Sequence, residues 1–349
     1  MNEAKANYRV KKHFQIVPHS PDQVELRYGV WNPTAFTLTD ESRAGKLFNL
    51  IRDLDGKKSV QTVAADNNVP RADVEGLVDH LLSLNVLENK STSALDYYLE
   101  QTYAPAVNQS LLTGLQQPII LLGDEDFVEE IGRNIARSID GLKHNLIKTE
   151  FELFRRLKQS NNDWLYDSLL LERELKNYQS WQNHFIVLAL SNVDPVLAFK
   201  LNRIAYSLNI SWIHAAIDGP FIFIGPTFSG THGPCYNCFE NRIAMNIREQ
   251  ASYQKYKQAL VNAKIVAKKN VLHPIILSLA AAHLTMEILN FNFTQTNFTK
   301  GKVLSFFLPT MEIMFNEVLR LSSCHICGSV QYKDEHQLYF DYQALLGAV

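Results

Sequence analysis

The sequence contains no uninterrupted run of 18 or more apolar residues, so it predicts no membrane-spanning helix. It also lacks an excess of either charge, because 34 Lys and Arg stand against 36 Asp and Glu. Proteins that bind nucleic acid through bulk electrostatics carry a clear basic excess, so the net charge of −2 argues against that class. Cysteine is scarce as well, with four residues in 349. Four cysteines favour metal ligands or free thiols over a disulfide framework.

The organisation of the chain follows from its length and from one polar stretch. A chain of 349 residues can bury two separate cores. The polar stretch Ser91 to Gly114 divides it, so we expect a domain over 1–90, a linker over 91–116 and a domain over 117–349. Residues Met1 to Lys5 lack the apolar stretch of a secretory signal, and we therefore expect a cytoplasmic protein.

The first domain changes its hydrophobic period from two to that of a helix. Alternation predicts three strands, through Val10 to Ile16, Val24 to Val30 and Phe36 to Leu38. Helical spacing then predicts three helices: one over Ala44 to Leu54 closed by Gly56, a short one capped by Ser59, and one that begins at Pro70. Three strands followed by three short helices are typical of a winged helix-turn-helix.

The third predicted helix has an acidic surface. Its residues outside the core are Arg71, Asp73, Glu75, Asp79 and His80. A helix that enters the major groove needs basic side chains for phosphates and Arg, Asn or Gln for base edges. The charge therefore disfavours a DNA-binding regulator.

A second interpretation of this domain is capture of a peptide by strand addition. The exposed strand edge at Ala35, Phe36, Thr37, Leu38 and Thr39 would supply main-chain hydrogen bonds. Pockets against the third helix would supply selectivity, through Val74, Val78 and Leu81. A third interpretation is a domain that only packs against the rest of the chain.

The second domain alternates strands with helices. Apolar runs predict strands at Pro118 to Leu122, Asn145 to Ile147, His184 to Leu190, Ile210 to Ile213, a hairpin pair around Gly219, and Phe306 to Phe315. Helices are predicted between them, over Val128 to Ile139 and Pro195 to Leu208. The alternation indicates an α/β fold with a doubly wound, mostly parallel sheet. The apolar stretch His273 to Phe291 is interrupted by polar residues, so we expect a buried core helix there.

All four cysteines fall into two C-x-x-C pairs, Cys235 with Cys238 and Cys324 with Cys327. Two such pairs supply the four thiolates of a tetrahedral zinc site, which leaves no position for water and is structural. The competing interpretation is a redox C-x-x-C motif, but the presence of two such pairs disfavours a redox role. His232 and His325 lie near the cysteines in sequence, and we expect them to be bystanders.

Several strings resemble a known family. Gly225-Pro226-Thr227-Phe228, Gly230 to Cys238, and Cys324-His325-Ile326-Cys327-Gly328 resemble the glycine-, proline- and cysteine-rich segments of ubiquitin-activating-enzyme-like (ThiF-type) proteins of peptide-antibiotic clusters. The resemblance covers roughly residue 117 to the C-terminus, and the strand from His184 into Pro195 also fits it. His325 replaces a proline of the family pattern.

With the N-terminal winged helix, the chain resembles the leader-peptide-binding partner protein of thiazole/oxazole-forming cyclodehydratases, which act on ribosomally made peptides (RiPPs). The resemblance implies a non-catalytic subunit that binds the leader of a precursor peptide. It also implies a partner YcaO-type cyclodehydratase, RiPP or bacteriocin biosynthesis as the setting, a structural zinc, and a possible homodimer.

The nucleotide loop departs from the pattern of the active relatives. They carry a glycine-rich loop after the first strand, whereas this chain has Gly123 and Asp124 there, and its next glycine is Gly132. Asn192 stands where active relatives place a magnesium-binding Asp, and Asp194 lies two residues further on. We infer a degenerate nucleotide loop and no cofactor besides zinc.

Two alternatives remain open for this domain. In the first, Asp194 is the aligned metal ligand and the chain is an ATP-dependent adenylating enzyme that acts on a peptide C-terminus. Arg155 and Arg156 are close in sequence but do not match the family's adenylation motif. The basic stretch from Glu240 to Lys269 is either a receptor for an acidic peptide or partner, or a solvated helix face.

Overall fold

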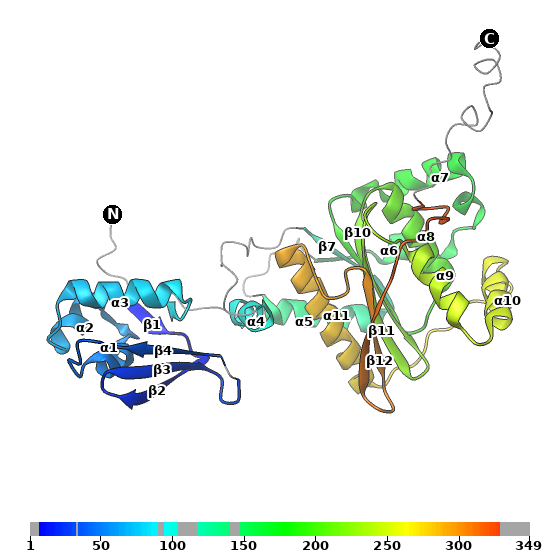
Figure 1. Cartoon of the computed structure of the whole chain (residues 1–349). Coiled ribbons are helices and arrows are strands. Elements are labelled where there is room, and N and C mark those ends of the chain that lie inside the picture. Colours follow the sequence, from blue (N-terminus) through cyan, green and yellow to red (C-terminus); the bar gives the residue numbers. More distant parts are fainter. Residues whose placement is uncertain (1–6, 33, 90–93, 104–116, 140–146, 329–349) are drawn as a thin grey trace, which may run out of the picture. The chain divides into compact units, whose positions relative to one another are not determined.

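The computed structural model describes residues 7–32, 34–89, 94–103, 117–139 and 147–328 (Figure 1). The chain forms two compact units, the N-terminal unit Met1–Gln109 and the C-terminal unit Ser110–Val349. Parts of the sequence-based expectations lie outside the described residues: much of the linker over 91–116, the start of the strand at Asn145, and the last 21 residues, 329–349.

The N-terminal unit has two small antiparallel sheets. One has the order β2 (Phe14–Ser20), β3 (Gln23–Tyr28), β4 (Ala35–Thr39), and in the other β1 (Asn7–Val10) lies between β5 (Asp55–Ser59) and β6 (Leu87–Glu88). The prediction of one strand from Val10 to Ile16 is therefore wrong. A turn, in which the N–H of Phe14 donates to the carbonyl of Lys11 (3.0 Å), separates β1 from β2 and sends them into different sheets.

Three helices follow in the predicted order: α1 (Leu47–Asp53), α2 (Val60–Asp66) and α3 (Arg71–Ser83). Ser59 caps α2 as predicted, since its hydroxyl accepts from the Thr62 N–H at 3.2 Å. Gly56 does not close α1, which already ends at Asp53. Gly56 instead lies within β5 with a positive φ of 82°, a conformation that suits glycine.

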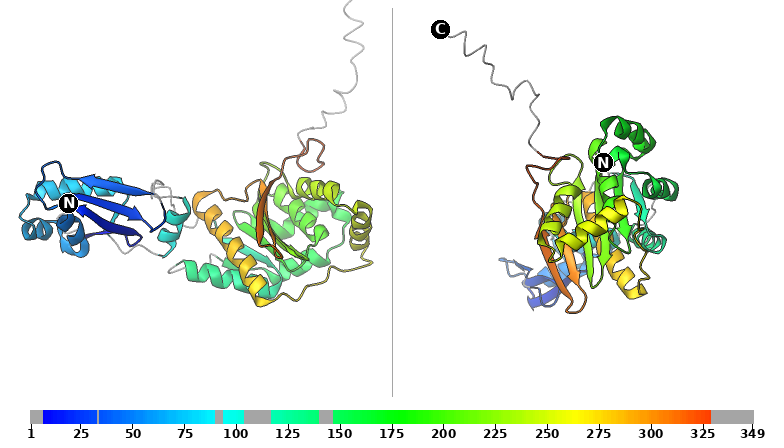
Figure 2. Two further views of the ribbon diagram at one scale, coloured as in Figure 1. Left: turned by 60° about the horizontal axis from the view of Figure 1, so that its bottom comes forward. Right: turned by 90° about the vertical axis from the view of Figure 1, so that its right-hand side faces the viewer.

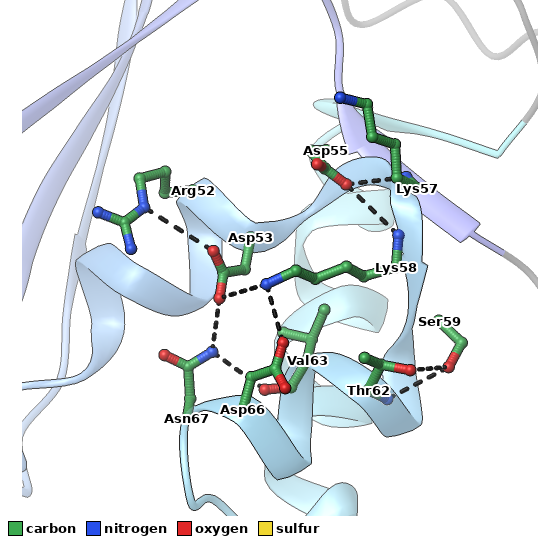
Figure 3. A network of polar contacts seen from close by, with 10 residues as sticks. All are labelled: Arg52, Asp53, Asp55, Lys57, Lys58, Ser59, Thr62, Val63, Asp66 and Asn67. Atoms are coloured by element: carbon green, nitrogen blue, oxygen red, sulfur yellow. Dashed lines mark hydrogen bonds and ion pairs between the residues drawn. The ribbon is translucent and has the colours of Figure 1, made fainter.

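A polar network explains why β5 is fixed between two helices, although its sequence is not apolar (Figure 3). The Lys58 ammonium contacts Asp53 at the end of α1 (3.3 Å) and Asp66 at the end of α2 (2.9 Å). The Asn67 amide also donates to Asp53 at 3.0 Å. Side-chain contacts of this kind carry no hydrophobic period, which is why the pattern did not reveal this strand.

The expected connector contains a helix, α4 (Ala94–Tyr103), that packs on the N-terminal unit. The ammonium of Lys11 lies 2.6 Å from a carboxylate oxygen of Glu100, and both side chains are buried. The same ammonium donates to Asn85 at 2.7 Å, and the Tyr97 hydroxyl donates to Glu88 at 3.1 Å. A buried charge is tolerated only when it is paired, so this cluster fixes α4 against β1 and β6.

The C-terminal unit is built on a seven-stranded sheet in the order β13-β12-β11-β10-β9-β7-β8. Its strands are β7 (Ile119–Gly123), β8 (Ile147–Thr149), β9 (Phe185–Leu190), β10 (Ser211–Asp218), β11 (Phe221–Ser229), β12 (Lys302–Phe307) and β13 (Glu312–Glu317). Strands β8, β7, β9 and β10 pair in parallel, and the pairs from β10 to β13 are antiparallel. Five of the seven strands thus run in one direction, which confirms an α/β fold with a mostly parallel sheet.

Helices cover both faces of this sheet (Figure 2). One face carries α5 (Glu125–Ser138) and α11 (Pro274–Thr294), and the other carries α6 (Phe151–Gln159), α8 (Pro195–Ser207) and α9 (Tyr236–Asn246). The remaining helices are α7 (Ser168–Leu175), α10 (Gln250–Val261) and two 3-10 turns, Asp163–Leu165 and Lys176–Trp181.

Helix α11 is long and apolar enough to cross a membrane by length and composition. Half of its most apolar window is buried inside the unit, where it packs against α5, β10 and β11. The ring of Phe291 stacks on that of Phe185 in β9 with centroids 4.4 Å apart. These contacts are those of a core helix, as the polar interruptions of its sequence predicted.

Candidate functional site: a cysteine cluster, a filled strand end and an open sheet edge

The four cysteines come together from two distant segments. Cys235 precedes the first turn of α9 and Cys238 lies in that turn, whereas Cys324 and Cys327 lie in the turns that follow β13. All four side chains are buried. Within the described part of the chain, this is the one group of three or more His, Cys, Asp or Glu side chains placed to hold a metal ion.

The sulfur atoms have the spacing of a tetrahedral site. Cys235 Sγ lies 3.6 Å from Cys324 Sγ and 4.0 Å from Cys238 Sγ, and Cys238 Sγ lies 3.2 Å from Cys327 Sγ. All four lie within 4.8 Å of one another. A tetrahedron with metal–sulfur bonds of ~2.3 Å has sulfur–sulfur edges of ~3.8 Å. The cluster therefore fits a four-thiolate metal site.

Further donors surround the sulfurs. The Asn237 side-chain amide donates to Cys324 Sγ at 3.2 Å, and the N–H of Leu321 donates to Cys238 Sγ at 3.3 Å. Hydrogen bonds from Cys235 and the other thiols hold the pKa of Cys324 well below its ordinary value. Such donors favour the thiolate, which is the form that binds metal. His325 is no part of the cluster, because its ring packs near Phe199 with centroids 5.9 Å apart.

The strand end expected to hold a degenerate nucleotide loop is very short. Strand β7 ends at Gly123 and α5 begins at Glu125, so Asp124 alone connects them. A Cβ on Gly123 would lie 1.8 Å from the carbonyl oxygen of Ala189 in β9, so glycine is required here by close packing of two strands. Gly132 lies in the interior of α5, away from this connection.

Protein groups occupy the hydrogen-bonding positions at this strand end. The Asp124 carboxylate accepts from the N–H of Ser191 at 2.7 Å and from the Ser191 hydroxyl. Asn270 donates to the same serine through its backbone N–H and its side-chain amide, at 3.2 Å each. The Lys269 ammonium lies 3.0 Å from Asp126, which raises the pKa of Lys269.

The space left beside these groups is small. Its volume is about 270 Å³, and Phe127, Val271, Leu272 and Leu277 complete its lining. Small-molecule sites span about 300–1,000 Å³. The helix N-terminus that would bind phosphates in a nucleotide-binding protein instead begins with the acidic residues Asp124, Glu125 and Asp126, whose negative charge would repel a phosphate.

A larger groove of about 1,150 Å³ lies beside the first turns of α8. Two of the charged side chains that line it, Asp194 and Lys200, stabilise helix ends. The Asp194 carboxylate accepts from Leu197 N–H (3.0 Å), so it caps α8, and the Lys200 ammonium donates to the carbonyls of Leu157 and Ser160 at the end of α6. Burial lowers the pKa of Lys200. These contacts account for Asp194 without a metal ion.

The other polar residues singled out near the strand end also have protein partners. The Asn192 amide donates to the carbonyl of Lys268 at 3.2 Å. Arg155 pairs with Glu152 at 3.0 Å, within its own helix, and both side chains are exposed. In the basic stretch, the Lys257 ammonium lies 2.7 Å from the buried carboxylate of Glu240.

Among the strands that the structure describes, β4 pairs only with β3, so its other side is an open edge of the sheet. Two hydrogen bonds, one at each end of the β3–β4 pair, show which residues of β4 bond to β3. They run from Tyr28 N–H to Thr34 O (3.0 Å) and from Asp40 N–H to Asp22 O (2.8 Å). Antiparallel partners alternate between pairs that exchange hydrogen bonds and pairs that do not. Phe36 and Leu38 therefore bond to β3, whereas the N–H and C=O groups of Ala35, Thr37 and Thr39 point outward.

The opposite edge of the same sheet, at β2, is protected. His13 bonds to β3 through the hydrogen bond from Gly29 N–H to His13 O (3.4 Å). By alternation, the backbone groups of Phe14, Ile16 and Pro18 therefore point outward from the sheet. The N–H of Phe14 is used in a turn, and Pro18 has no N–H. Proline at an outward position is a common way to block an edge strand. The two edges thus differ in their ability to accept another strand.

The side chains expected to shape peptide pockets lie in different environments. Phe36 and Leu38 are half-buried and pack against the core of the N-terminal unit. Val74, Val78 and Leu81 are buried within that core, with at most 3% of each exposed. They hold α3 in place and present no surface to a peptide in this structure. On the outer surface of α3, Arg71 pairs with Glu75 at 2.7 Å.

Comparisons with known proteins place this fold. No protein-family profile and no curated protein matches the sequence. Among solved structures, the chain is similar to the heterocyclase TruD, with 17% identity and a TM-score of 0.64 over 93% of this chain and 43% of that one. It is also similar to a heterocyclase in complex with substrate and cofactor, with 16% identity and a TM-score of 0.65 over 93% of this chain and 39% of that one.

Escherichia coli MccB, solved with ATP, is similar at 15% identity and a TM-score of 0.52, over 92% of this chain and 99% of that one. The chain spans only about two fifths of the heterocyclase chains. At these identities the likeness shows the fold. The protein therefore shares its fold with the aligned part of TruD and with MccB, and the resemblance seen in its sequence is supported at the level of the fold.

Proposed function

We propose that this protein is the leader-binding subunit of a heterocycle-forming complex. Its N-terminal winged helix captures the leader of a ribosomally made precursor peptide as an added strand on β4. The observation that carries the proposal is the open edge of β4, with its outward groups at Ala35, Thr37 and Thr39. Main-chain hydrogen bonds along such an edge supply affinity for an extended peptide.

A DNA-binding role of the winged helix has less support. The exposed residues of α3 include Asp73, Glu75 and Asp79, whose charge would repel a phosphate backbone. The edge of β4 carries no such obstacle to a peptide. Duplex binding that weakens with salt would be the result that favours DNA.

The C-terminal unit serves as a scaffold in this proposal. A zinc ion held by Cys235, Cys238, Cys324 and Cys327 joins α9 to the segment after β13. When bound, zinc would supply a structural crosslink, because four thiolates leave no coordination position for substrate or water. The acidic strand end at Asp124 supports a subunit that performs no ATP chemistry of its own.

A separate YcaO-type cyclodehydratase is the proposed catalytic partner. Holding the leader on one protein raises the local concentration of the core peptide at the other's active site. The heterocyclases that share this fold have chains more than twice as long as the aligned part. We propose a cytoplasmic complex, with this chain as a homodimer within it.

The direct test is calorimetric titration with a synthetic leader from the precursor encoded beside this chain's gene. We expect a Kd in the micromolar range or tighter. Thr37→Pro removes one outward N–H without removing a bond to β3, so it should weaken binding at least about tenfold. Thr37→Val keeps the N–H and should bind within about twofold of the wild type.

Circular dichroism checks that both variants fold. Absence of heat with the wild type would reject the leader-binding role. Equal binding by the proline and valine variants would reject strand addition at β4.

Adenylation of a peptide C-terminus is the second candidate, because the fold also matches nearly the whole length of a protein solved with ATP. Pyrophosphate exchange separates the two. A robust ATP-dependent signal from the purified chain would establish the enzyme, and background exchange is what the filled strand end leads us to expect.

A further inference from the structure

The loop between β3 and β4 exposes a large apolar surface. Trp31 is 96% exposed and its neighbour Val30 is 70% exposed. The other three tryptophans, Trp164, Trp181 and Trp212, are buried. A tryptophan this exposed is unusual, since the side chain is large and apolar and is highly buried on average.

The loop holds Trp31 in a defined place. Sequence alternation predicted a strand as far as Val30, but β3 ends at Tyr28, and Gly29 turns the chain with a φ of 78°. The Arg27 guanidinium then donates to the carbonyl of Val30 at 3.1 Å. These contacts present the tryptophan on a structured turn.

Trp31 also lies close in the chain to the open edge of β4. The chain passes from it into β4 within four residues, so it lies at the Ala35 end of the edge rather than at the Thr39 end. The edge supplies hydrogen bonds to any extended segment and carries no side-chain selectivity of its own. Aromatic anchors next to a hydrogen-bonding edge are the usual source of binding energy and choice of partner.

We propose that Trp31, with Val30, is the apolar anchor of the peptide site, and that the bound segment carries an aromatic or large aliphatic side chain at the end that meets it. This inference rests on the proposed peptide-binding function. In an antiparallel addition the strand runs opposite to β4, so the anchored residue is at the C-terminal end of the bound segment.

Charge supports an apolar occupant over an acidic or basic one. Next to the edge, the half-buried side chain of Arg27 is already paired with Glu25 at 3.0 Å, and Glu25 also contacts His19 at 2.8 Å. The outward residues of β4 are Ala35, Thr37 and Thr39, none of which is charged. At the Ala35 end, next to Trp31, the described residues of the edge therefore offer no unpaired charge to a strongly charged peptide, whereas the acidic residues Asp40 and Glu41 follow its Thr39 end.

The test uses the full-length protein and a phage library of random dodecapeptides, from which enriched peptides are synthesised. Because the other three tryptophans are buried, a blue shift of the emission on peptide binding reports on Trp31. We expect such a shift, a loss of affinity of at least about tenfold for Trp31→Ala, and binding within about threefold for Trp31→Phe. Enriched peptides should share a large apolar residue near their C-terminal end.

Two variants distinguish the anchor role of Trp31 from peptide binding by strand addition on β4. If Thr37→Pro weakens binding and Trp31→Ala does not, the edge binds peptide and the anchor is wrong. If Trp31→Ala weakens binding and Thr37→Pro does not, the peptide contacts the tryptophan without adding a strand, and the proposed edge is wrong. Enriched peptides that leave the emission and both variants unaffected would overturn both.

Discussion

The cysteine cluster and the end of β7 are both places where the fold could hold a ligand, but they differ in what surrounds them. The cluster presents four metal-binding side chains, whereas other protein groups occupy the end of β7. At the cluster, the nearest polar neighbours of each sulfur are other sulfurs and two amide donors. At the strand end, the carboxylate of Asp124 is already bonded to Ser191, and Lys269 lies beside Asp126.

The cysteine cluster has the ligands for a metal ion. The strand end has its polar groups hydrogen-bonded to one another, so it has little capacity left for a ligand. Four buried thiolates in mutual contact would repel one another, and a bound metal cation neutralises that charge. The strand end has no such deficit, because its hydrogen bonds are made between protein groups. Cys238→Ser changes the first of these environments, and Asp124→Ala and Lys269→Ala change the second.

Cys238→Ser should have the largest effect. The sulfur contacts Cys235 and Cys327, and its loss would open the metal site and separate α9 from the segment after β13. We expect a loss of about 4 kcal/mol, or roughly 8–16 °C in Tm for a unit of this size. By mass spectrometry, we expect one zinc per chain in the wild type and a small fraction of that in the variant.

His232→Ala is the control for that variant, since His232 is exposed and lies outside the cluster. It should keep the metal and the Tm of the wild type. A Cys238→Ser protein with unchanged Tm and no zinc in the wild type would show that the cluster is a set of free thiols.

The sequence predicted the cluster better than the strand end, for a physical reason. Two C-x-x-C pairs with no cysteine left over define a donor set almost without regard to the rest of the fold. The contacts that fill the strand end join Asp124 to Ser191 and Ser191 to Asn270, across 67 and 79 positions. No local period or spacing indicates such pairs.

The N-terminal unit shows the same limit. Hydrophobic periods predicted β3, β4, α1, α2 and α3, because each buries one apolar face. They missed β5, which a network of charges holds, and α4, which a buried pair between Lys11 and Glu100 fixes. Polar pairing between distant residues carries no periodic signal.

Acid should weaken the C-terminal unit near the cluster. His214 in β10 is buried, with its ring 5.6 Å from that of Tyr236, and burial lowers the pKa of His214 to about 4. The unfolded chain binds a proton near pH 6.5, so stability is fully present above that pH and is lost as pH falls toward 4. Between pH 7.5 and 5 the loss should be roughly 2 kcal/mol.

Urea unfolding at the two pH values, followed by tryptophan emission, measures this slope. His214→Gln should flatten it, and His232→Gln, at an exposed position, should not. Equal slopes in all three proteins would assign the acid sensitivity to other groups, the cluster thiols first.

Asp124→Ala should have a smaller effect on stability. It leaves the N–H and hydroxyl of the buried Ser191 without their acceptor, which costs about 1–2 kcal/mol. Asp124→Asn keeps an acceptor oxygen and should recover most of that loss in chemical denaturation. If the two variants were equally stable, the hydrogen bonds to Ser191 would not be what holds this strand end.

Lys269→Ala should have the smallest effect and is the most direct probe of the filled site. The pair with Asp126 is exposed, so its loss should cost under about 1 kcal/mol. Removing the lysine takes away an ammonium beside Asp124, Glu125 and Asp126, and three carboxylates would then repel a triphosphate more strongly. Pyrophosphate exchange should therefore stay at background in this variant, whereas an ATP-dependent signal would mean that the lysine blocks a site that still works.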